Sequence, residues 1–144
     1  MIEFFKNSNP ITLELACGKG EYSVGLAERY PNKNFIGIDI KGARFWRGAK
    51  TAVANELHNV AFLRTRIELL DHFFAPNEVD TIWITFPDPH LRRGDEKNRL
   101  TAPRFIELYR RIAKPTATIN LKTDDPVLHS WSAETCAELG ATSR

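Results

Sequence analysis

Short apolar segments rich in β-branched residues alternate along this sequence with longer segments that have helical spacing. The predicted strands are Ile11–Ala16, Asn34–Asp39, Val60–Leu63, Val79–Phe86 and Thr116–Leu121. The predicted helices are Glu21–Tyr30, Ala43–His58, Ile67–Phe74, Thr101–Ala113 (capped by Thr101) and Pro126–Leu139. This alternation is typical of βαβ units, in which right-handed crossovers join parallel strands. We therefore expect an α/β fold with a doubly wound, mostly parallel sheet.

The size and composition of the chain are those of one folded domain. Its 144 residues lie in the usual range for a single domain, and an apolar fraction of 42% is enough for a packed core. No internal repeat, low-complexity tract or linker divides the sequence. We expect a single domain over residues 1–144.

The sequence argues against several kinds of protein. Cys17 and Cys136 are its only cysteines and form no CxxC pair, so neither a disulfide framework nor a thiolate metal site is indicated. Its histidines lack the spacing of metal ligands. No apolar run approaches the roughly 20 residues that span a bilayer, and the first residues do not resemble a secretory signal. We expect a cytoplasmic protein with no metal and no membrane partner.

Residues suited to ligand binding follow the predicted strands. In parallel α/β sheets, ligands bind at the carboxyl ends of the strands, near the point where the strand order reverses. Three of these ends carry carboxylates and one carries a glycine-bearing turn: Asp39, Asp88, Asp124 and Gly18–Gly20. The sequence therefore predicts a ligand site at this edge of the sheet.

The first two strand ends favour an adenosine-containing ligand. Asp39 lies 21 residues after Gly18, where a carboxylate accepts hydrogen bonds from ribose hydroxyls. This fits either a dinucleotide or S-adenosylmethionine. A dinucleotide fingerprint has a third glycine where this chain has Ser23. Glu14 lies within a strand that should be buried, where a cationic methionyl amino group would balance its charge and a pyrophosphate would be repelled. The two features favour S-adenosylmethionine.

Four motifs occur together in this order and spacing, and they point to one family. They are Glu14-Leu-Ala-Cys-Gly-Lys-Gly, Gly37-Ile-Asp39, Phe86-Pro-Asp-Pro89 with basic residues after it, and Lys122-Thr-Asp124. From about Asn9 to Gly140, the chain resembles the bacterial tRNA (guanine-N7)-methyltransferases. The most specific motif is Phe86-Pro-Asp-Pro89 with its basic stretch, because other methyltransferases carry different residues there.

This resemblance implies a Rossmann-like methyltransferase sheet that binds S-adenosyl-L-methionine and releases S-adenosylhomocysteine. The glycine turn and the carboxylate before it would hold the methionyl part, and Asp39 the ribose. Arg66 stands where the family commonly has an aspartate, so the backbone N–H groups of Arg66 and Ile67 would contact the adenine. The implied cofactor-binding residues are Glu14, Gly18, Gly20, Asp39, Arg66 and Ile67.

The resemblance also implies the methyl acceptor, N7 of guanine 46 in the variable loop of tRNA. Asp88 would be the catalytic residue at the methyl-transfer centre and would also bind the guanine. Arg92, where the family usually has a lysine, and Asp124 would be further substrate contacts. The implied contacts to tRNA phosphates are Arg93, Lys97 and Arg99.

Basic residues gather in two parts of a chain whose net charge is only +2. Residues 41–66 hold six basic residues against one acidic, and residues 90–111 hold seven against three. Such segments are typical of a surface that docks an anionic partner, and also of ordinary solvated helices. Trp46, Trp83 and Trp131 are able to stack on bases, although Trp83 lies in a predicted central strand.

The chain departs from the family in ways that keep other readings open. Ala16 replaces the first glycine of the cofactor turn. The family's chains are longer, so we expect its N-terminal and C-terminal parts, with the last strands of the sheet, to be missing from these 144 residues. The alternatives are a nucleotide-cofactor (NAD-type) oxidoreductase and a catalytically inactive tRNA-binding module. A monomer or a homodimer is expected.

Overall fold

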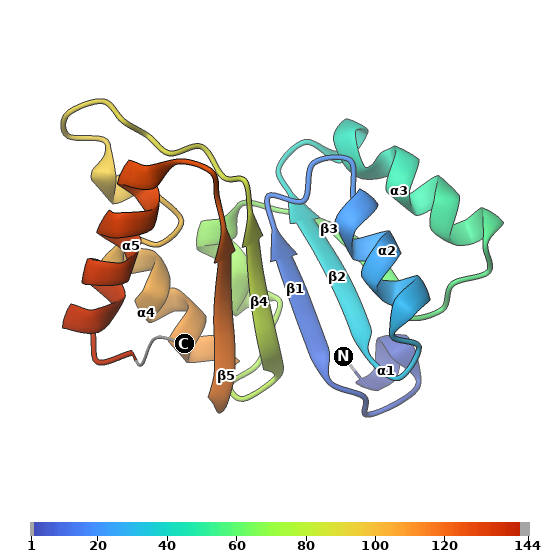
Figure 1. The fold of residues 1–144 in the computed structure, drawn as a ribbon. Coiled ribbons are helices and arrows are strands. Elements are labelled where there is room, and N and C mark those ends of the chain that lie inside the picture. Colours follow the sequence, from blue (N-terminus) through green and yellow to red (C-terminus); the bar gives the residue numbers. More distant parts are fainter. Residues whose placement is uncertain (1, 142–144) are drawn as a thin grey trace.

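Five parallel strands form the central layer of the protein in the order β3-β2-β1-β4-β5 (Figure 1). The computed structural model describes residues 2–141. The strands are β1 (Ile11–Leu15), β2 (Asn34–Asp39), β3 (Val60–Arg64), β4 (Val79–Thr85) and β5 (Ala113–Lys122). The strand order reverses between β1 and β4, so their carboxyl ends form the switch point at which such sheets bind ligands.

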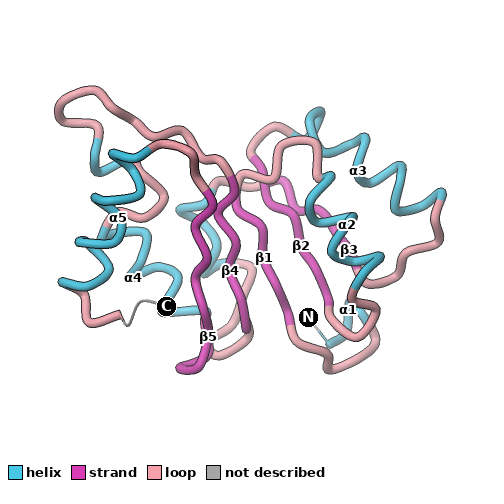
Figure 2. The backbone as a smooth tube through the Cα atoms, viewed as in Figure 1, coloured by secondary structure: helices cyan, strands magenta, loops and turns pink. Residues whose placement is uncertain are grey.

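Helices cover both faces of the sheet (Figures 1 and 2). On one face lie α2 (Glu21–Arg29) and α3 (Gly42–Ala54), and on the other α4 (Pro103–Ile112) and α5 (Pro126–Glu138). The shorter helices are α1 (Ile2–Phe5) and the 3₁₀ turns η1 (Ile67–His72) and η2 (Glu96–Asn98). The α/β, doubly wound parallel sheet expected from the sequence is confirmed.

The core lies on both sides of β1, β2 and β4. Every residue of β1 and β2 is buried, which explains why these strands read as continuous apolar runs. Side chains from the helices complete the core. Among them, Tyr109 of α4 is fully buried, and its hydroxyl donates a hydrogen bond to the carbonyl of Leu100 at 2.7 Å.

Several helix boundaries differ from the predicted ones by one to four residues, and two of these differences have a clear physical cause. The helix predicted over 43–58 ends at Ala54, because the N–H of Glu56 bonds to the carbonyl of Val53 and the N–H of Leu57 to that of Ala52. With Glu56 at a φ of 54°, this pair of bonds is a Schellman motif. Thr101 does not cap α4: its hydroxyl is paired with that of Ser132 at 2.6 Å, and the N-cap is Ala102.

The edge strand β5 is longer than predicted and contains a proline. It starts at Ala113, directly after α4, and includes Pro115. Proline lacks a backbone N–H, and an edge strand tolerates this because one of its sides forms no ladder. Among residues 2–141, β5 pairs only with β4, and Thr85 at the end of β4 lies opposite Lys122.

Candidate functional site

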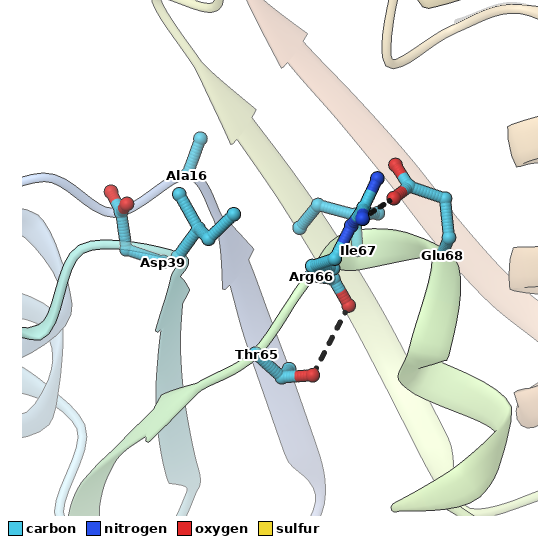
Figure 3. Close-up of a pocket in the computed structure, with 7 residues that line it drawn as sticks. Ala16, Asp39, Thr65, Arg66, Ile67 and Glu68 are labelled. Carbon is cyan, nitrogen blue, oxygen red and sulfur yellow. Dashed lines mark hydrogen bonds and ion pairs between the residues drawn. The ribbon is translucent and has the colours of Figure 1, made fainter.

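A hollow of about 230 Å³ opens at the carboxyl ends of β1, β2 and β3 (Figure 3). Its lining comes from the last residue of β2 and from residues that follow the three strands: Ala16, Asp39, Ile40, Thr65, Arg66, Ile67 and Glu68. Three of the residues expected to bind a cofactor, Asp39, Arg66 and Ile67, therefore share one hollow. In Figure 3 the Arg66 side chain turns toward Glu68, to which its Nε donates a hydrogen bond at 3.0 Å.

Asp39 joins the glycine turn to the start of α3. The residue is only 5% exposed. One carboxylate oxygen accepts a hydrogen bond from the N–H of Gly18 at 2.9 Å, and the other accepts one from the N–H of Lys41 at 3.0 Å. Each carboxylate oxygen can accept more than one hydrogen bond, so acceptor capacity remains for a ligand in the hollow.

The turn after β1 requires glycine at one position for two reasons. Gly20 has a φ of 77°, and a Cβ there would lie 2.4 Å from the ring of Phe62. Gly18 also has a positive φ, 57°, but a Cβ there would meet no atom within 4 Å. Ala16 adopts a φ of 55° although it carries a Cβ, which makes it a strained residue at the edge of the hollow.

Glu14 is buried in β1 and held by two hydroxyl groups. One carboxylate oxygen accepts a hydrogen bond from the Ser23 hydroxyl at 2.7 Å, and the other accepts one from the Thr85 hydroxyl at 2.7 Å. Burial raises the pKa of this carboxyl, and the two hydroxyls lower it in part. Glu14 is not among the residues that line the hollow. It links β1 to α2 and to the end of β4, directly before the loop that carries Asp88.

Sequence reasoning did not identify Ser23 and Thr85 as partners of Glu14. Ser23 was noted only because it stands where a dinucleotide fingerprint has glycine. A buried carboxylate needs hydrogen-bond donors. Ser23 lies three positions after the turn and Thr85 lies at the end of a neighbouring strand, so the sequence could have indicated both hydroxyls as donors to Glu14.

Cys17, in the same turn, is an unreactive thiol. Burial is the main reason that its pKa rises to about 12, and the nearby carboxylates Glu14 and Asp39 raise it further. The thiol therefore stays protonated at neutral pH and does not act as a nucleophile.

Asp88 lies in the exposed loop after β4. One of its carboxylate oxygens accepts a hydrogen bond from the N–H of His90 at 2.9 Å. Phe86 and His90, on either side, have positive φ values of 47° and 45°. The N–H of Phe86 bonds to the carbonyl of Lys122 at 2.8 Å and so ties the start of the loop to β5. Asp88 does not line the hollow, and it stands on the other side of the switch point.

The basic residues of this loop fall into two groups. Arg92, Arg93 and Lys97 are exposed. Arg99 is only 4% exposed, and its guanidinium donates hydrogen bonds to the carbonyls of Pro89 at 2.8 Å and His90 at 3.2 Å. The contact between Arg99 and a tRNA phosphate stays a prediction, and the burial of Arg99 and its two hydrogen bonds within the loop argue against it.

Arg99 also packs on an aromatic ring. Its guanidinium carbon lies 4.7 Å from the centre of the Trp131 ring in α5. The carbonyls that it binds come directly after Asp88 in the chain, so Arg99 anchors the second half of the Asp88 loop on α5. We assign Arg99 to the support of this loop.

Asp124 is exposed just beyond the carboxyl end of β5, next to the strand that leads to Asp88. Its neighbour Asp125 caps α5 by accepting a hydrogen bond from the N–H of Leu128 at 2.8 Å. Over residues 2–141, no group of three or more His, Cys, Asp and Glu side chains is placed to hold a metal ion. In the same part of the chain, no helix has the length and apolar character to cross a membrane.

The sequence matches a known family over nearly its whole length. Residues 8–144 fit the family described as "Putative methyltransferase". The chain belongs to this family.

The resemblance of the chain to tRNA (guanine-N7)-methyltransferases is confirmed by curated relatives of that name. One, from Christiangramia forsetii, is 57% identical over 129 residues, which are 90% of this chain and 58% of the relative. Another, from Porphyromonas gingivalis, is 56% identical over 130 residues, which are 90% of this chain and 52% of the relative. This methyltransferase chain thus spans little more than half the length of these relatives.

Solved structures show the same fold. The aminoglycoside resistance methyltransferase NpmB1 superimposes with a TM-score of 0.67 at 22% sequence identity, over 96% of this chain and 66% of NpmB1. The Rossmann-like methyltransferase architecture expected from the resemblance is therefore confirmed.

Proposed function

We propose that this methyltransferase transfers a methyl group from S-adenosyl-L-methionine to N7 of a guanine in tRNA, guanine 46 of the variable loop. The observation that carries the proposal is the hollow beside Asp39, which opens at the carboxyl ends of β1, β2 and β3. The N–H of Gly18 in the neighbouring glycine turn is bonded to Asp39, and β1 borders the point where the strand order reverses. The choice of acceptor is supported by the names of the relatives that are 57% and 56% identical.

The residues of the hollow fit the adenosine part of the methyl donor. The Asp39 carboxylate can accept hydrogen bonds from the two ribose hydroxyls. Ile40 and Ile67 line the same hollow and offer apolar surface to a flat purine, and the backbone N–H groups of Arg66 and Ile67 would serve its ring nitrogens. A pocket with apolar walls and a few polar groups is the usual form of such a site.

Glu14 and the glycine turn would hold the methionyl end, with Gly18 and Gly20 allowing close approach of the backbone. A buried carboxyl whose pKa is raised is stabilised in its ionised form by a nearby cation, and the methionyl amino group is one. When bound, the donor supplies an electrophilic methyl group carried on a sulfonium. S-adenosylhomocysteine would leave as the product.

The acceptor atom requires little chemistry from the protein. Guanine N7 already carries a free lone pair, so no general base is needed. Methylation places a positive charge on the purine, and a fixed carboxylate beside the base stabilises that charge as it develops. Asp88 would supply this carboxylate and would position the N1–H and N2 edge of the guanine. Arg92 and Asp124 would contact the same substrate.

The rest of the tRNA would be held by phosphate contacts from Arg93 and Lys97, which are exposed in the loop that carries Asp88. N7 lies inside folded tRNA, so exposing the base costs a few kcal/mol of unstacking, which such contacts offset. Cytoplasmic tRNA is the corresponding substrate pool, and we place the protein in the cytoplasm on this ground.

Methyl transfer with mapping of the product tests this function. The protein is incubated with labelled S-adenosylmethionine and unmodified tRNA, and the RNA is digested to nucleosides. We expect the label in 7-methylguanosine from the variable loop. Label on any other atom, or no transfer by protein that binds both tRNA and S-adenosylhomocysteine, would overturn it.

A further inference from the structure

The outward side of α3 carries a group of exposed basic residues around an exposed tryptophan. We call it the α3 basic face and define it as Lys41, Arg44, Trp46, Arg47 and Lys50. Trp46 is 62% exposed. With a rise of 1.5 Å per residue, the cations from position 41 to position 50 extend along roughly 14 Å of the helix axis.

No acidic residue offsets this charge within the helix. The segment Gly42–Ala54 contains neither aspartate nor glutamate. Some exposed cations elsewhere form ion pairs, for example Arg110 with Glu107, Arg111 with Asp71 and Lys114 with Asp80. In the part of the chain that the structure describes, the cations of the α3 basic face form no ion pair. The face is therefore an uncompensated positive surface.

The tryptophan of this face is arranged as an aromatic surface beside a cation. Lys50 Nζ lies 5.0 Å from the centre of the Trp46 ring. An exposed aromatic ring next to a cation offers stacking to an unpaired base and electrostatic attraction to its phosphate at the same time. An anionic polymer with flat bases fits both groups.

The position of α3 connects this surface to the proposed methyl-donor site. Lys41 directly precedes α3, and its N–H is bonded to the Asp39 carboxylate that lines the hollow. Figure 1 shows the start of α3 and the long loop between β4 and α4 at the same end of the strands, on opposite sides of the switch point. Exposed cations therefore stand on both sides of the edge where the ligand sites lie.

We propose that the α3 basic face is a second RNA-binding surface, which contacts the sugar-phosphate backbone of the tRNA on the side of the donor site away from the Asp88 loop. This inference rests on the proposed function. The tRNA would then be held at two places, by Arg92, Arg93 and Lys97 on one side of the reacting guanine and by α3 on the other. Phosphate contacts on both sides of the reacting guanine would strengthen tRNA binding and would also set the orientation of the RNA.

Removing the charges of the helix tests the surface directly. The variant R44Q/R47Q/K50Q changes exposed side chains only, and its fold is checked by thermal melting. Binding of fluorescent tRNA is measured by anisotropy at several salt concentrations, in the presence of S-adenosylhomocysteine. We expect about tenfold weaker binding or more, and a plot of log K against log salt that is less steep by roughly 2 to 3. Affinity for S-adenosylhomocysteine should not change.

The chain offers a matched control at the opposite end of the sheet. Arg29 and Lys33 lie by Tyr30, with Lys33 Nζ 5.0 Å from the ring centre, before the first residue of β2. This is the same combination of cations and aromatic ring, far along the strands from the ligand edge. The variant R29Q/K33Q should bind tRNA like the parent protein. In W46L we expect a smaller loss than in the charge variant, with an unchanged salt slope.

Three results would overturn the inference. The first is unchanged tRNA affinity in R44Q/R47Q/K50Q. The second is an equal loss of tRNA affinity in the R29Q/K33Q control. The third is that R44Q/R47Q/K50Q loses binding to anionic lipid vesicles while it keeps its binding to tRNA. These results are distinct from failure of the proposed function. If the parent binds tRNA through α3 but methylates an atom other than N7, only the proposed acceptor is wrong. If the parent methylates N7 and the α3 variant keeps its tRNA affinity, only this surface is wrong.

Discussion

Glu14 is the residue whose surroundings most clearly depart from those of an ordinary strand residue. A carboxyl in the middle of a fully buried strand destabilises the folded protein unless it is hydrogen-bonded or protonated. Here Ser23 and Thr85 supply the donors, and burial still raises the pKa. The ionised form of Glu14 therefore remains unfavourable in the folded protein. We interpret this as the feature of the site that favours a ligand with a cationic group, because the cation would stabilise the ionised carboxylate.

The stability of the protein should depend on pH in part because of the titration of Glu14. Because its pKa is raised in the folded state, the folded protein binds this proton more tightly than the unfolded chain does. Its contribution to stability therefore falls as the pH rises from the ordinary value of 4.5 through the raised folded pKa. Glu14→Gln should raise the melting temperature, and by more at pH 8 than at pH 4. For a chain of this size, each kcal/mol corresponds to roughly 2–4 °C.

The control for Glu14 is Glu134→Gln, which changes an exposed carboxylate of α5. It should leave the melting temperature close to that of the parent protein. A Glu14→Gln protein that is less stable than the parent at every pH would show that the two hydroxyl bonds outweigh the burial of the charge.

Asp88 should separate catalysis from donor binding. It lies in the loop after β4 and does not line the hollow, so its removal leaves the donor site intact. We expect Asp88→Ala to lower the rate of methyl transfer by about 100-fold or more, because a charge-stabilising group is lost. Affinity for S-adenosylhomocysteine, measured by calorimetry, should stay within about twofold. Asp95→Ala, in the same loop, is the control and should keep most of the activity.

At the level of elements, α3 is pressed against the turn that carries the proposed donor site. A Cβ on Gly48 would lie 2.6 Å from the carbonyl oxygen of Lys19 and 3.2 Å from the Cα of Gly20. Backbone atoms do not move aside as a flexible side chain does. The close packing of α3 on the turn therefore depends on this glycine.

A pair of glycine variants tests this packing. Gly48→Ala should destabilise the protein by about 1–3 kcal/mol and weaken binding of S-adenosylhomocysteine, because the turn must shift. Gly25→Ala, in α2, adds a Cβ that meets no atom within 4 Å and should stabilise the protein by up to about 1 kcal/mol. Urea denaturation and ligand titration measure both effects. Equal stability of the two variants would contradict the packing described for Gly48.

The elements differ in how far their sequence predicts them. The strand Asn34–Asp39 has the predicted bounds because six buried residues in a row leave little choice of ends. The end of α3 at Ala54 was missed, because a Schellman motif that places a glutamate at positive φ gives no glycine signal. Thr101 has the residue type of a cap, but a tertiary contact with Ser132 uses its hydroxyl. Tertiary partners of this kind are not visible in a local pattern.

In the candidate site too, some features could be predicted from the sequence and others could not. The hollow brings together Asp39, Arg66 and Ile67, which the motif spacing and the resemblance had indicated. The burial of Arg99 was not predictable from the loop, since it depends on Trp131 in a helix far along the chain. A run of basic residues alone does not tell an exposed arginine from one that supports the loop.

At the scale of the whole molecule, one edge of the sheet carries the proposed chemistry and both of the basic surfaces. The carboxylates Asp39, Asp88 and Asp124 follow three different strands at this edge, and exposed cations stand on either side of it. The net charge of +2 does not reveal that acidic side chains lie at the centre of this edge and basic side chains on either side of it. A surface that is acidic at its centre and basic at its sides suits a polyanion whose reacting base becomes positively charged.

Calorimetric titration with S-adenosylhomocysteine, set beside titration with NAD, tests most directly whether the hollow beside Asp39 is a methyl-donor site. We expect the protein to bind S-adenosylhomocysteine and not NAD. Asp39→Asn should weaken that binding by about tenfold or more, because hydrogen bonds to a charged acceptor are lost. Asp71→Asn, which changes a carboxylate paired with Arg111, should have no effect. Unchanged affinity in Asp39→Asn, or tighter binding of NAD than of S-adenosylhomocysteine, would contradict this account.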